Sequence, residues 1–379
     1  MNFRSLFLIL IFTSLFFNFS SCKKKSTKQS VKTRIIKDGF GREVKIPGKI
    51  NHIICSGSGC LRLICYMQCQ DMITGVDDAE TKKRKIDARP YAFANPQFKE
   101  YEVFGEFRGH DNPEMILNLK TIPDVIFKSY TSGAADSPDE LSNKVGIPVI
   151  AFNYGDLGYN RDDLFTAIRV IGETLSKQKR AEEIITFFTN HIEELNKRTK
   201  DIPKEKRKSA FIGGVAYRGP HGLQSTEPAY PPFKMVNAVN MVFDPDKSPK
   251  ELKHADVAKE KIVEWDPEII FVDLSTIQSE AKANAIYELK NDIVYSELSA
   301  VQNGKVYGVL PYNWYTKNFG SAIIDAYFIG KILYPEKFSD IKPDELADEV
   351  YSFLVEKPVF EQMNNAFDGL VFKKIAMLK

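Results

Sequence analysis

The chain has 379 residues, of which 43% are hydrophobic and 27% are charged, as expected for a folded globular protein with room for two lobes or one large domain. Its formal net charge of +2 is close to balance. Because no stripe of basic side chains with interleaved aromatics is present, nothing indicates a nucleic-acid-binding protein.

The N-terminal segment is typical of a secretory signal. A basic start with Arg4 precedes an apolar run over residues 6–19, which is too short to span a membrane comfortably. Residues 19–22 resemble a bacterial lipobox, with Phe19 where an aliphatic residue is usual and Cys22 at its end. The resemblance implies a signal peptide over residues 1–22, lipidation of Cys22, and secretion to the periplasm or the outer face of the cytoplasmic membrane. The basic, polar residues 23–33 are predicted to form a flexible tether.

Four further cysteines are grouped near the start of the mature chain: Cys55, Cys60, Cys65 and Cys69. Three of them lie in an apolar stretch that predicts a helix, so we interpret them as small core residues. A disulfide and a metal or cluster site remain alternatives. No CxxC pair is present, and two cysteines four residues apart on a helix rarely reach disulfide geometry.

Before residue 160, short apolar runs alternate with amphipathic stretches. We expect a hairpin over 35–47, strands over 52–55, 72–76, 125–127 and 148–152, and helices over 60–68, 113–119 and 139–145. Residues 77–110, rich in charged and aromatic side chains, are predicted to form a loop. The Gly/Ser loop at residues 56–59 leads from a strand into a helix, an arrangement that suits an anion. This alternation predicts a mostly parallel sheet.

The next segment, residues 162–199, is predicted to form one long helix. Apolar residues recur at helical spacing on both sides of a polar turn at residues 176–180, from Leu164 to Leu175 and from Ala181 to Leu195. Pro203 would stop the helix. An unbroken helix of this length would be about 55 Å long, at about 1.5 Å per residue, and could join two lobes.

After this helix the alternation returns. We expect strands over 209–213, 269–272 and 305–309, helices over 233–239, 259–265 and 320–333, and long loops over 217–232 and 311–315. Residues 341–379 are predicted to form amphipathic helices packed on the second lobe.

One internal similarity organises the chain. The helix–turn–strand segment at 114–127 has a counterpart at 260–271, on the other side of the long helix. We therefore predict an α/β protein with two Rossmann-like lobes, residues 34–158 and 201–340, joined by a connecting helix over 159–200. Ligand would bind in the cleft between the lobes, near the C-terminal ends of the strands.

With these features the chain resembles a known family, the substrate-binding proteins of ABC importers for iron complexes, haem and cobalamin. The resemblance covers residues 35–338 and rests on the opening at 38–47, on 116–126, on 171–175 and on 303–307. It implies two α/β lobes bridged by one long helix, and partners in an ABC permease and its ATPase. It also implies docking on the permease through one acidic residue per lobe, at the positions of Glu114 and Glu260.

The family has no fixed set of ligand contacts, so the candidates follow from chemistry. Arginine offers forked donors to anionic oxygens, and aromatic rings cover the flat faces of a large ligand. The candidates in the predicted cleft loops are Ser58, Arg89, Tyr91, Arg108, His110, Tyr217, Arg218, His221, Tyr312, Trp314 and Tyr315.

These residues favour a ferric siderophore or a similar metal chelate. A molybdate or tungstate oxyanion is an alternative that suits the loop at 56–59 with Arg218 and the two loop histidines. Haem or cobalamin, with His110, His221 or a tyrosine as axial ligand, is another. Bare zinc or manganese is least favoured, because only two of the five histidines lie in these loops. We expect no resident cofactor or metal, and a monomer.

Two other classes of protein are alternatives: a lipid-anchored hydrolase and a surface lipoprotein with a structural role. A lipid-anchored hydrolase is disfavoured because the chain has neither a Gly-x-Ser-x-Gly nor an HExxH motif. We therefore predict that the chain is not an enzyme. A surface lipoprotein with a purely structural role would lack a cleft.

Overall fold

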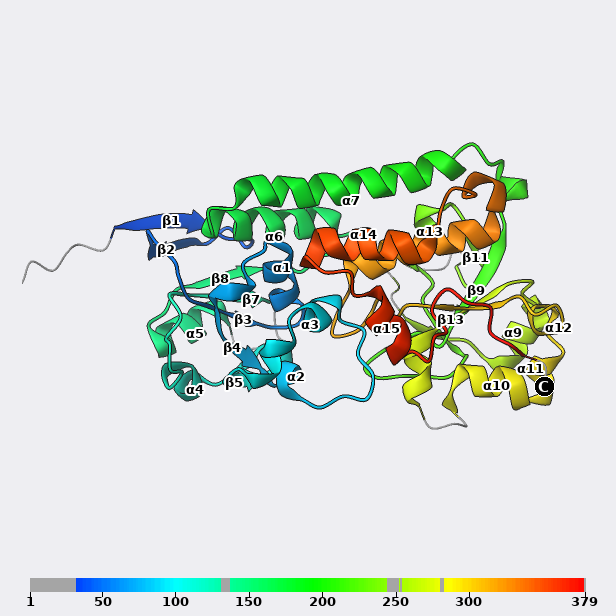
Figure 1. Cartoon of the computed structure of the whole chain (residues 1–379), viewed down its shortest axis with the longest axis horizontal. Coiled ribbons are helices and arrows are strands. Elements are labelled where there is room, and N and C mark those ends of the chain that lie inside the picture. The colour runs from blue at the N-terminus through cyan, green and yellow to red at the C-terminus, as the bar shows by residue number, and fades with distance from the viewer. Residues whose placement is uncertain (1–31, 131–136, 244–251, 253, 280–282, 378–379) are drawn as a thin grey trace, which may run out of the picture.

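The computed structural model describes residues 32–130, 137–243, 252, 254–279 and 283–377. Two α/β lobes lie side by side, with the first lobe at the left of Figure 1 and the second at the right. The predicted α/β architecture of two lobes is confirmed. The predicted signal peptide, Cys22 and residues 23–31 of the tether lie outside the described residues.

The first lobe is built on a six-stranded sheet with the order β6-β5-β4-β3-β7-β8. All neighbours pair in parallel except β5 and β6. Its strands are β3 (Ile53–Ser56), β4 (Ile73–Asp77), β5 (Val103–Glu106), β6 (His110–Asp111), β7 (Val125–Ser129) and β8 (Val149–Phe152). The hairpin of β1 (Thr33–Lys37) and β2 (Glu43–Pro47) precedes it.

The second lobe contains a four-stranded parallel sheet with the order β11-β9-β13-β14. Its strands are β9 (Ser209–Gly213), β11 (Val239–Asn240), β13 (Ile270–Asp273) and β14 (Val306–Val309). The short strands β10 (Ser225–Thr226) and β12 (Ala255–Asp256) pair beside it. The central strands of both sheets are buried, as their continuous apolar runs predict.

Helices cover both sheets. They are α1 (Cys60–Tyr66), α2 (Asp78–Thr81), α3 (Pro90–Ala94), α4 (Pro113–Leu117), α5 (Pro138–Val145), α6 (Arg161–Thr174), α7 (Gln178–Thr199), α8 (Pro231–Met235), α9 (Lys259–Trp265), α10 (Ala285–Asn291), α11 (Ile293–Ser296), α12 (Ser299–Gln302), α13 (Phe319–Leu333), α14 (Pro343–Val355) and α15 (Phe360–Ala366). Short 3₁₀ turns add η1 (Gln70–Met72), η2 (Pro96–Glu100), η3 (Phe107–Gly109), η4 (Lys204–Lys206), η5 (Leu274–Gln278) and η7 (Pro335–Lys337). No helix among the described residues is long and apolar enough to cross a membrane.

The predicted long helix is broken, which corrects the single helix expected over 159–200. The chain reverses at Ser176, whose φ of 57° lies in the left-handed region. Helices α6 and α7 then pack against each other, with Arg169 Nε on α6 donating to Glu182 Oε1 on α7 at 2.7 Å. Of these two helices, α7 is the one that runs from one lobe to the other, and it is about 33 Å long at 1.5 Å per residue (Figure 1).

Residues 77–110, predicted as a loop, instead contain α2, α3, β5 and two 3₁₀ turns. Helix α3 is held down by the buried Arg89 guanidinium, which pairs with Glu80 at 2.8 Å and Asp87 at 2.7 Å. The charges that suggested a solvated loop are thus partners of one another inside the first lobe.

The C-terminal helices also differ from their prediction. Helix α14 packs on α13 of the second lobe, but it also contacts α1 and α3 of the first lobe. Gln70 Nε2 donates to Glu356 Oε2 at 2.8 Å, and Lys357 donates to the carbonyl of Ala94. The chain therefore crosses between the lobes a second time, on the same side as α7 (Figure 1).

A continuous apolar core runs through both lobes, and a smaller cluster lies under α4 and α5. Cys55, Cys60, Cys65 and Cys69 are all buried in this core, and none forms a disulfide. Burial raises the pKa of the Cys55 and Cys65 thiols well above the usual value. This agrees with their interpretation as small core residues.

Candidate ligand-binding site

A cavity of about 440 Å³ lies between the two lobes. The first lobe lines it with Ser58, Lys82, Arg84, Phe107 and Arg108. The second lobe lines it with Ala216, Arg218, Gly219, Pro220, Gln278, Asn313, Trp314, Tyr315 and Thr316. The predicted cleft between the lobes is thus present.

The charged side chains that line this cavity in the described part of the chain are all positive. They are Lys82, Arg84, Arg108 and Arg218, and no carboxylate of a described residue is among the lining. Lys82 pairs with Asp78 at 2.5 Å, whereas the three arginines form no ion pair within the described part of the chain. Arg108 and Arg218 lie over the rings of their neighbours Phe107 and Tyr217, at 4.9 and 5.4 Å from the ring centroids. Exposed guanidinium groups around a cleft attract anions and can bind their oxygens in pairs.

On the first-lobe side, the floor of the cavity is the Gly/Ser loop that leads from β3 into α1. Gly57 and Gly59 have φ of 85° and 82°, which only glycine adopts easily. A Cβ on Gly59 would lie 2.6 Å from Thr316 Cγ2 and 2.4 Å from the Tyr154 ring. Glycine at this position lets the second-lobe loop approach the backbone beside Ser58.

On the second-lobe side, the floor is the loop of residues 311–318 between β14 and α13. Arg62 of α1, which is fully buried, donates from Nη1 to the carbonyl of Lys317 at 2.8 Å. Its Nη2 donates to the carbonyls of Trp314 at 3.2 Å and Tyr315 at 3.3 Å. Tyr315 and Thr316 both have positive φ, of 48° and 62°. Such strained backbone persists only where the surrounding structure stabilises it, and here the hydrogen bonds from Arg62 of the first lobe do so.

Tyr315 also links the lobes through its side chain. Its hydroxyl donates to the Asp77 carboxylate at the end of β4. Burial raises the pKa of Asp77 to about 7. The side chain of Tyr315, which lines the cavity, is therefore held by the Asp77 carboxyl group, whose pKa is near neutrality.

Five of the eleven residues predicted as ligand contacts line the cavity: Ser58, Arg108, Arg218, Trp314 and Tyr315. They are brought together from both lobes, and as ligand contacts they stay predictions. Trp314 is buried, with its ring centroid 6.2 Å from that of Phe367.

The other six residues lie elsewhere. Arg89 and Tyr91 are buried in the first lobe with Glu80, to which Tyr91 donates at 2.7 Å. Tyr312 is buried and donates to Glu227 Oε2 at 2.5 Å. The exposed Tyr217 stacks on His254 at 4.2 Å, and the carbonyl of Tyr217 contacts His221 Nε2 at 2.6 Å. His110 is exposed on β6, outside the cavity lining. Buried partners, which local sequence does not indicate, decide the positions of Arg89, Tyr91 and Tyr312.

The cavity is also lined by polar and aromatic residues that were not among the predicted contacts: Lys82, Arg84, Phe107, Gln278, Asn313 and Thr316. The run from Lys82 to Lys85 was a visible signal, because a basic run in a predicted cleft loop suits an anionic ligand. Phe107 stands next to a predicted arginine. Asn313 and Thr316 carried no such signal, since their place depends on how the loop of residues 311–318 folds.

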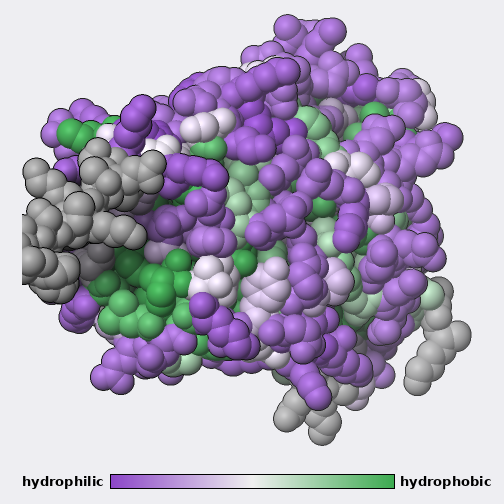
Figure 2. Space-filling view, turned by 60° about the vertical axis from the view of Figure 1, so that its left-hand side comes forward, coloured by the Kyte–Doolittle hydropathy of each residue, from purple (hydrophilic) through white to green (hydrophobic). Residues whose placement is uncertain are grey.

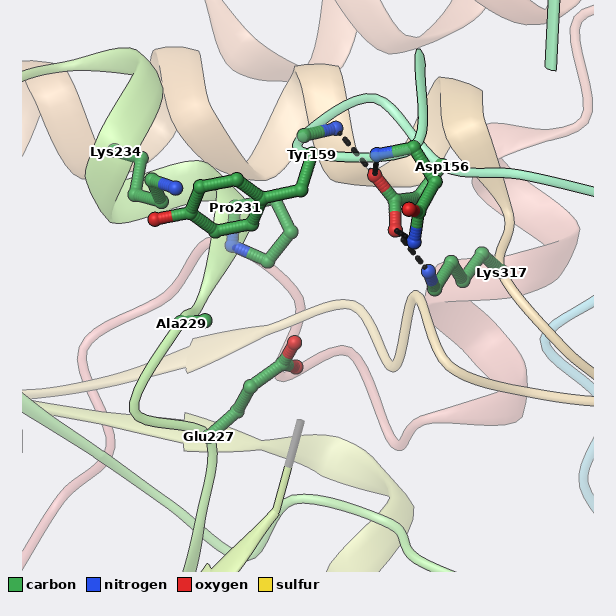
Figure 3. A pocket seen from close by; sticks show the side chains of 9 residues that line it. Asp156, Tyr159, Glu227, Ala229, Pro231, Lys234 and Lys317 are labelled. Atoms are coloured by element: carbon green, nitrogen blue, oxygen red, sulfur yellow. Dashed lines mark hydrogen bonds and ion pairs between the residues drawn. The ribbon is translucent and has the colours of Figure 1, made fainter. Parts of the chain in front are cut away.

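A second, smaller pocket lies where the lobes meet (Figure 3). Lys317 pairs with Asp156 at 2.8 Å, and Lys234 lies 3.3 Å from the centroid of the Tyr159 ring. Figure 3 shows the Glu227 carboxylate below these two pairs, and burial raises its pKa to about 7. With a volume of about 20 Å³, the pocket holds little more than one water molecule. We interpret it as a polar contact between lobes.

The two predicted docking residues occupy equivalent places. Glu114 lies in the first turn of α4, Glu260 lies in the first turn of α9, and both are exposed. In Figure 1, α4 and α9 lie on the side of the molecule away from α7. Figure 2 shows a mostly hydrophilic surface, with an apolar area on the part of the first lobe that this view brings forward.

Comparison with known proteins decides the family. Residues 71–312 match the model of the family described as periplasmic binding protein. The chain belongs to the periplasmic binding protein family. It is therefore a substrate-binding protein of an ABC transporter. Such a protein lies in the periplasm or outside the cell and delivers its ligand to a transporter made of a permease and an ATPase. The proteins that it resembles are solute-binding proteins, which confirms the prediction that it is not an enzyme.

Three relatives show how far this periplasmic binding protein is matched. The molybdate-binding protein MolA of Haemophilus influenzae is 24% identical over 375 residues, covering 93% of this chain and 96% of MolA. The structure of MolA bound to molybdate matches with a TM-score of 0.65, covering 86% of this chain and 98% of that chain. The uncharacterized ABC transporter substrate-binding lipoprotein YvrC of Bacillus subtilis is 21% identical, covering 84% and 92%. The iron-uptake system-binding protein of the same organism is 23% identical, covering 62% and 72%.

Proposed function

We propose that the protein captures an anionic metal chelate of the ferric siderophore class in the cleft between its lobes and delivers it to the permease. The observation that carries the proposal is the lining of the cavity. Among the described residues, four cationic side chains and no carboxylate line the cavity of about 440 Å³, and the rings of Phe107 and Tyr315 line it as well. Arginines suit the charged oxygens of a chelate, and aromatic rings suit its flat parts.

A bare metal ion suits this cavity poorly. Cationic side chains repel it, and no group of three or more His, Cys, Asp or Glu side chains in the described residues could hold one. Haem and cobalamin lose support as well. Of the axial ligands expected for them, neither His110 nor His221 lines the cavity, and the hydroxyl of Tyr315, which does line it, donates to Asp77. The ligand that we propose is cargo, and no resident cofactor enters the proposal.

Molybdate or tungstate is the second candidate. It is favoured by the likeness to MolA, which extends over 93% of the chain. Ser58 and Arg218 would be its contacts among the predicted residues. A single four-oxygen anion would fill only a small part of a cavity of about 440 Å³, so the size favours the chelate.

We also propose that the protein is anchored by a lipid on Cys22. The lipobox-like stretch at residues 19–22 supports this, and the relative YvrC is named a lipoprotein. Residues 23–33 would then act as the tether between the membrane and the hairpin of β1 and β2.

Docking on the permease through Glu114 and Glu260 is a further part of the proposal. Twelve large hydrophobic side chains are exposed in the described residues, and seven of them lie on or next to α4 and α9–α11: Met115, Leu117, Ile122, Val263, Tyr287, Ile293 and Val294. An acidic residue bordered by exposed apolar side chains on each lobe suits a partner with two similar basic and apolar surfaces.

The test is a fluorescence titration of the chain from Lys23 with ferric catecholate, hydroxamate and citrate chelates, haem, cobalamin, molybdate and tungstate. One of the two tryptophans, Trp314, lines the cavity. We expect a submicromolar response to a ferric chelate. A response to molybdate or tungstate alone would make the oxyanion the ligand, and silence towards every anion would contradict the proposal.

The same titration on Arg218→Ala tests the site. Loss of a hydrogen bond to a charged ligand should weaken binding by about 1.5–3 kcal/mol. Arg169→Ala is the matched control, because it removes the same charge from the α6–α7 hairpin, away from the cavity. An affinity of Arg218→Ala equal to that of the control would remove Arg218 from the site.

A further inference from the structure

The buried Arg62 has an unusual set of partners. Its side chain forms no ion pair with any described residue, although it is fully buried. Its hydrogen bonds go to the Tyr154 hydroxyl at 2.6 Å and to the carbonyls of Trp314, Tyr315 and Lys317. A buried cation without a counter-ion is costly, so its partners must supply the compensation. Three of them are carbonyls of one loop on the other lobe.

These bonds determine where the amide groups of the loop point. The peptide bonds are trans and planar, so the N–H of each residue points opposite to the carbonyl of the residue before it. The carbonyls of Trp314 and Tyr315 point to Arg62. The N–H groups of Tyr315 and Thr316 therefore point away from Arg62. Neither of them donates a hydrogen bond to another group in the described ranges.

Trp314, Tyr315 and Thr316 line the cavity, whereas Arg62 does not. Ser58 lines the cavity from the first lobe, and its neighbour Gly59 lies against Thr316. The two residues that carry the free N–H groups therefore belong to the cavity lining, as do Arg108 and Arg218.

We propose that the backbone N–H groups of Tyr315 and Thr316 form an anion-binding pair at the cleft floor, and that Arg62 is the positioning residue that aims them. The pair would bind a charged oxygen of the ligand, while Arg108 and Arg218 bind from the sides. This inference rests on the proposed function, since it requires an anionic ligand, and it adds the group that orients that ligand.

The physical advantage of this arrangement is preorganisation. Side chains such as Arg218 must give up rotamer freedom to bind, whereas the amides are already fixed by the backbone. Backbone N–H groups in left-handed turns are known to form concave anion sites. The charge of Arg62 adds to the positive potential without contacting the ligand.

The experiment uses amide NMR of the ¹⁵N-labelled chain that begins at Lys23. The protein is titrated with sodium molybdate and, separately, with gallium citrate as the analogue of ferric citrate. We expect the amides of Tyr315 and Thr316 to show the largest downfield shifts, with Gly146, remote on the first lobe, unchanged. Binding detected by fluorescence without a shift of these two amides would overturn the inference and leave the proposed function intact. Failure of every anionic probe to bind would overturn both.

Two variants make the test independent of spectral assignment. Replacing the peptide bond before Thr316 with an ester removes one N–H and keeps every side chain. We expect it to weaken binding about tenfold or more, as for a hydrogen bond to a charged group. The same ester before Ile293, an exposed residue on α11, is the control and should change affinity less than twofold. Equal affinities of the two esters would overturn the inference.

Arg62→Lys tests the positioning role, because lysine keeps the charge but lacks the fork that reaches three carbonyls. We expect weaker binding and altered Tyr315 and Thr316 amide shifts in the free protein. Arg180→Lys is the matched control, since Arg180 also donates to two carbonyls, those of Tyr66 and Phe353, away from the cavity. Wild-type affinity in Arg62→Lys would argue against the role.

Discussion

Three buried carboxyl groups lie at or just after the C-terminal ends of strands: Asp77 ends β4, Asp273 ends β13, and Glu227 follows β10. Burial raises the pKa values of Asp77, Glu227 and Asp273 to about 7. Asp77 and Glu227 accept tyrosine hydroxyls from the second-lobe loop that forms the cleft floor. Asp273 instead caps η5 by accepting from the N–H of Ser275 at 2.9 Å. Each group is therefore more easily protonated in the folded chain than in the unfolded chain.

This predicts how stability depends on pH. A group whose folded pKa is raised stabilises the fold below its unfolded pKa, and that contribution is lost as the pH rises through the folded value. For Asp273 the window runs from its ordinary value of 3.8 to about 7. Asp273→Asn should flatten the fall of unfolding free energy over this window by up to about 1.4 kcal/mol per pH unit. Urea denaturation followed by circular dichroism at pH 4.5–7.5 measures it.

Asp340→Asn is the control for that experiment. Arg198 holds the pKa of the Asp340 carboxyl at about 2, so this group does not titrate above pH 4.5. Its replacement should leave the slope unchanged. The same slope in Asp273→Asn and the wild type would contradict the assignment of a raised pKa to Asp273.

At the residue scale, the sequence indicated that arginine and aromatic side chains line the site, but it did not indicate which individual arginines do so. Arg89 and Arg218 both stand in stretches rich in tyrosine, glycine or proline. Arg89 finds Glu80 and Asp87 and is buried, whereas Arg218 finds no carboxylate within the described residues and faces the cavity. Local composition cannot distinguish them, because the partners of Arg89 depend on how residues 77–91 fold.

At the scale of elements, the contact between α6 and α7 depends on one glycine. A Cβ on Gly172 would lie 2.7 Å from the Cβ of Ala181, closer than real side chains approach. Gly172→Ala should therefore lower the free energy of unfolding by about 1–3 kcal/mol through overpacking. Thermal or urea denaturation of the purified chain provides the measurement.

Ala181→Gly supplies a second arm for this prediction. Alone it should cost about 1 kcal/mol of helix propensity. Combined with Gly172→Ala it makes room for the new methyl group, so the double variant should be more stable than the sum of the two losses predicts. Strict additivity would show that the two residues do not meet.

Most elements could be predicted from periodicity and turn residues, including strands β3, β4, β7, β8, β9, β13 and β14 and helices α1, α4, α5, α9 and α13. The short strands β5, β6 and β11 could not, because they carry no alternating apolar run of their own. The break between α6 and α7 could not. Apolar residues keep helical spacing on both sides of Ser176, so a bent helix and a hairpin give the same pattern. Ser176 in the left-handed region carries no sequence signal comparable to that of a glycine.

At the scale of the whole molecule, the docking proposal makes a clear prediction. Glu114→Lys with Glu260→Lys should leave ligand affinity unchanged and abolish uptake into proteoliposomes that contain the permease and ATPase. Glu193→Lys with Glu205→Lys, two exposed residues on or just after α7, is the control with the same change of charge. Uptake by the first double variant at the control rate would rule out docking through these residues.

The two-lobe organisation was visible in the sequence because the helix–turn–strand repeat occurs once on each side of α6 and α7. The position of the C-terminal helices was not. Their amphipathic pattern identifies a buried face, but the pattern does not say which lobe that face meets. Only the fold shows α14 in contact with α1 and α3 as well as α13.

The second crossing has a mechanical consequence. Helices α7 and α14 run between the lobes along the same side of the molecule (Figure 1). The rings of Phe187 on α7 and Phe353 on α14 stack with their centroids 4.1 Å apart. Because two packed helices join the lobes along one side, we expect the lobes to separate from each other on the opposite side. Helices α4 and α9 lie toward that side (Figure 1). A force applied there acts with a long lever arm.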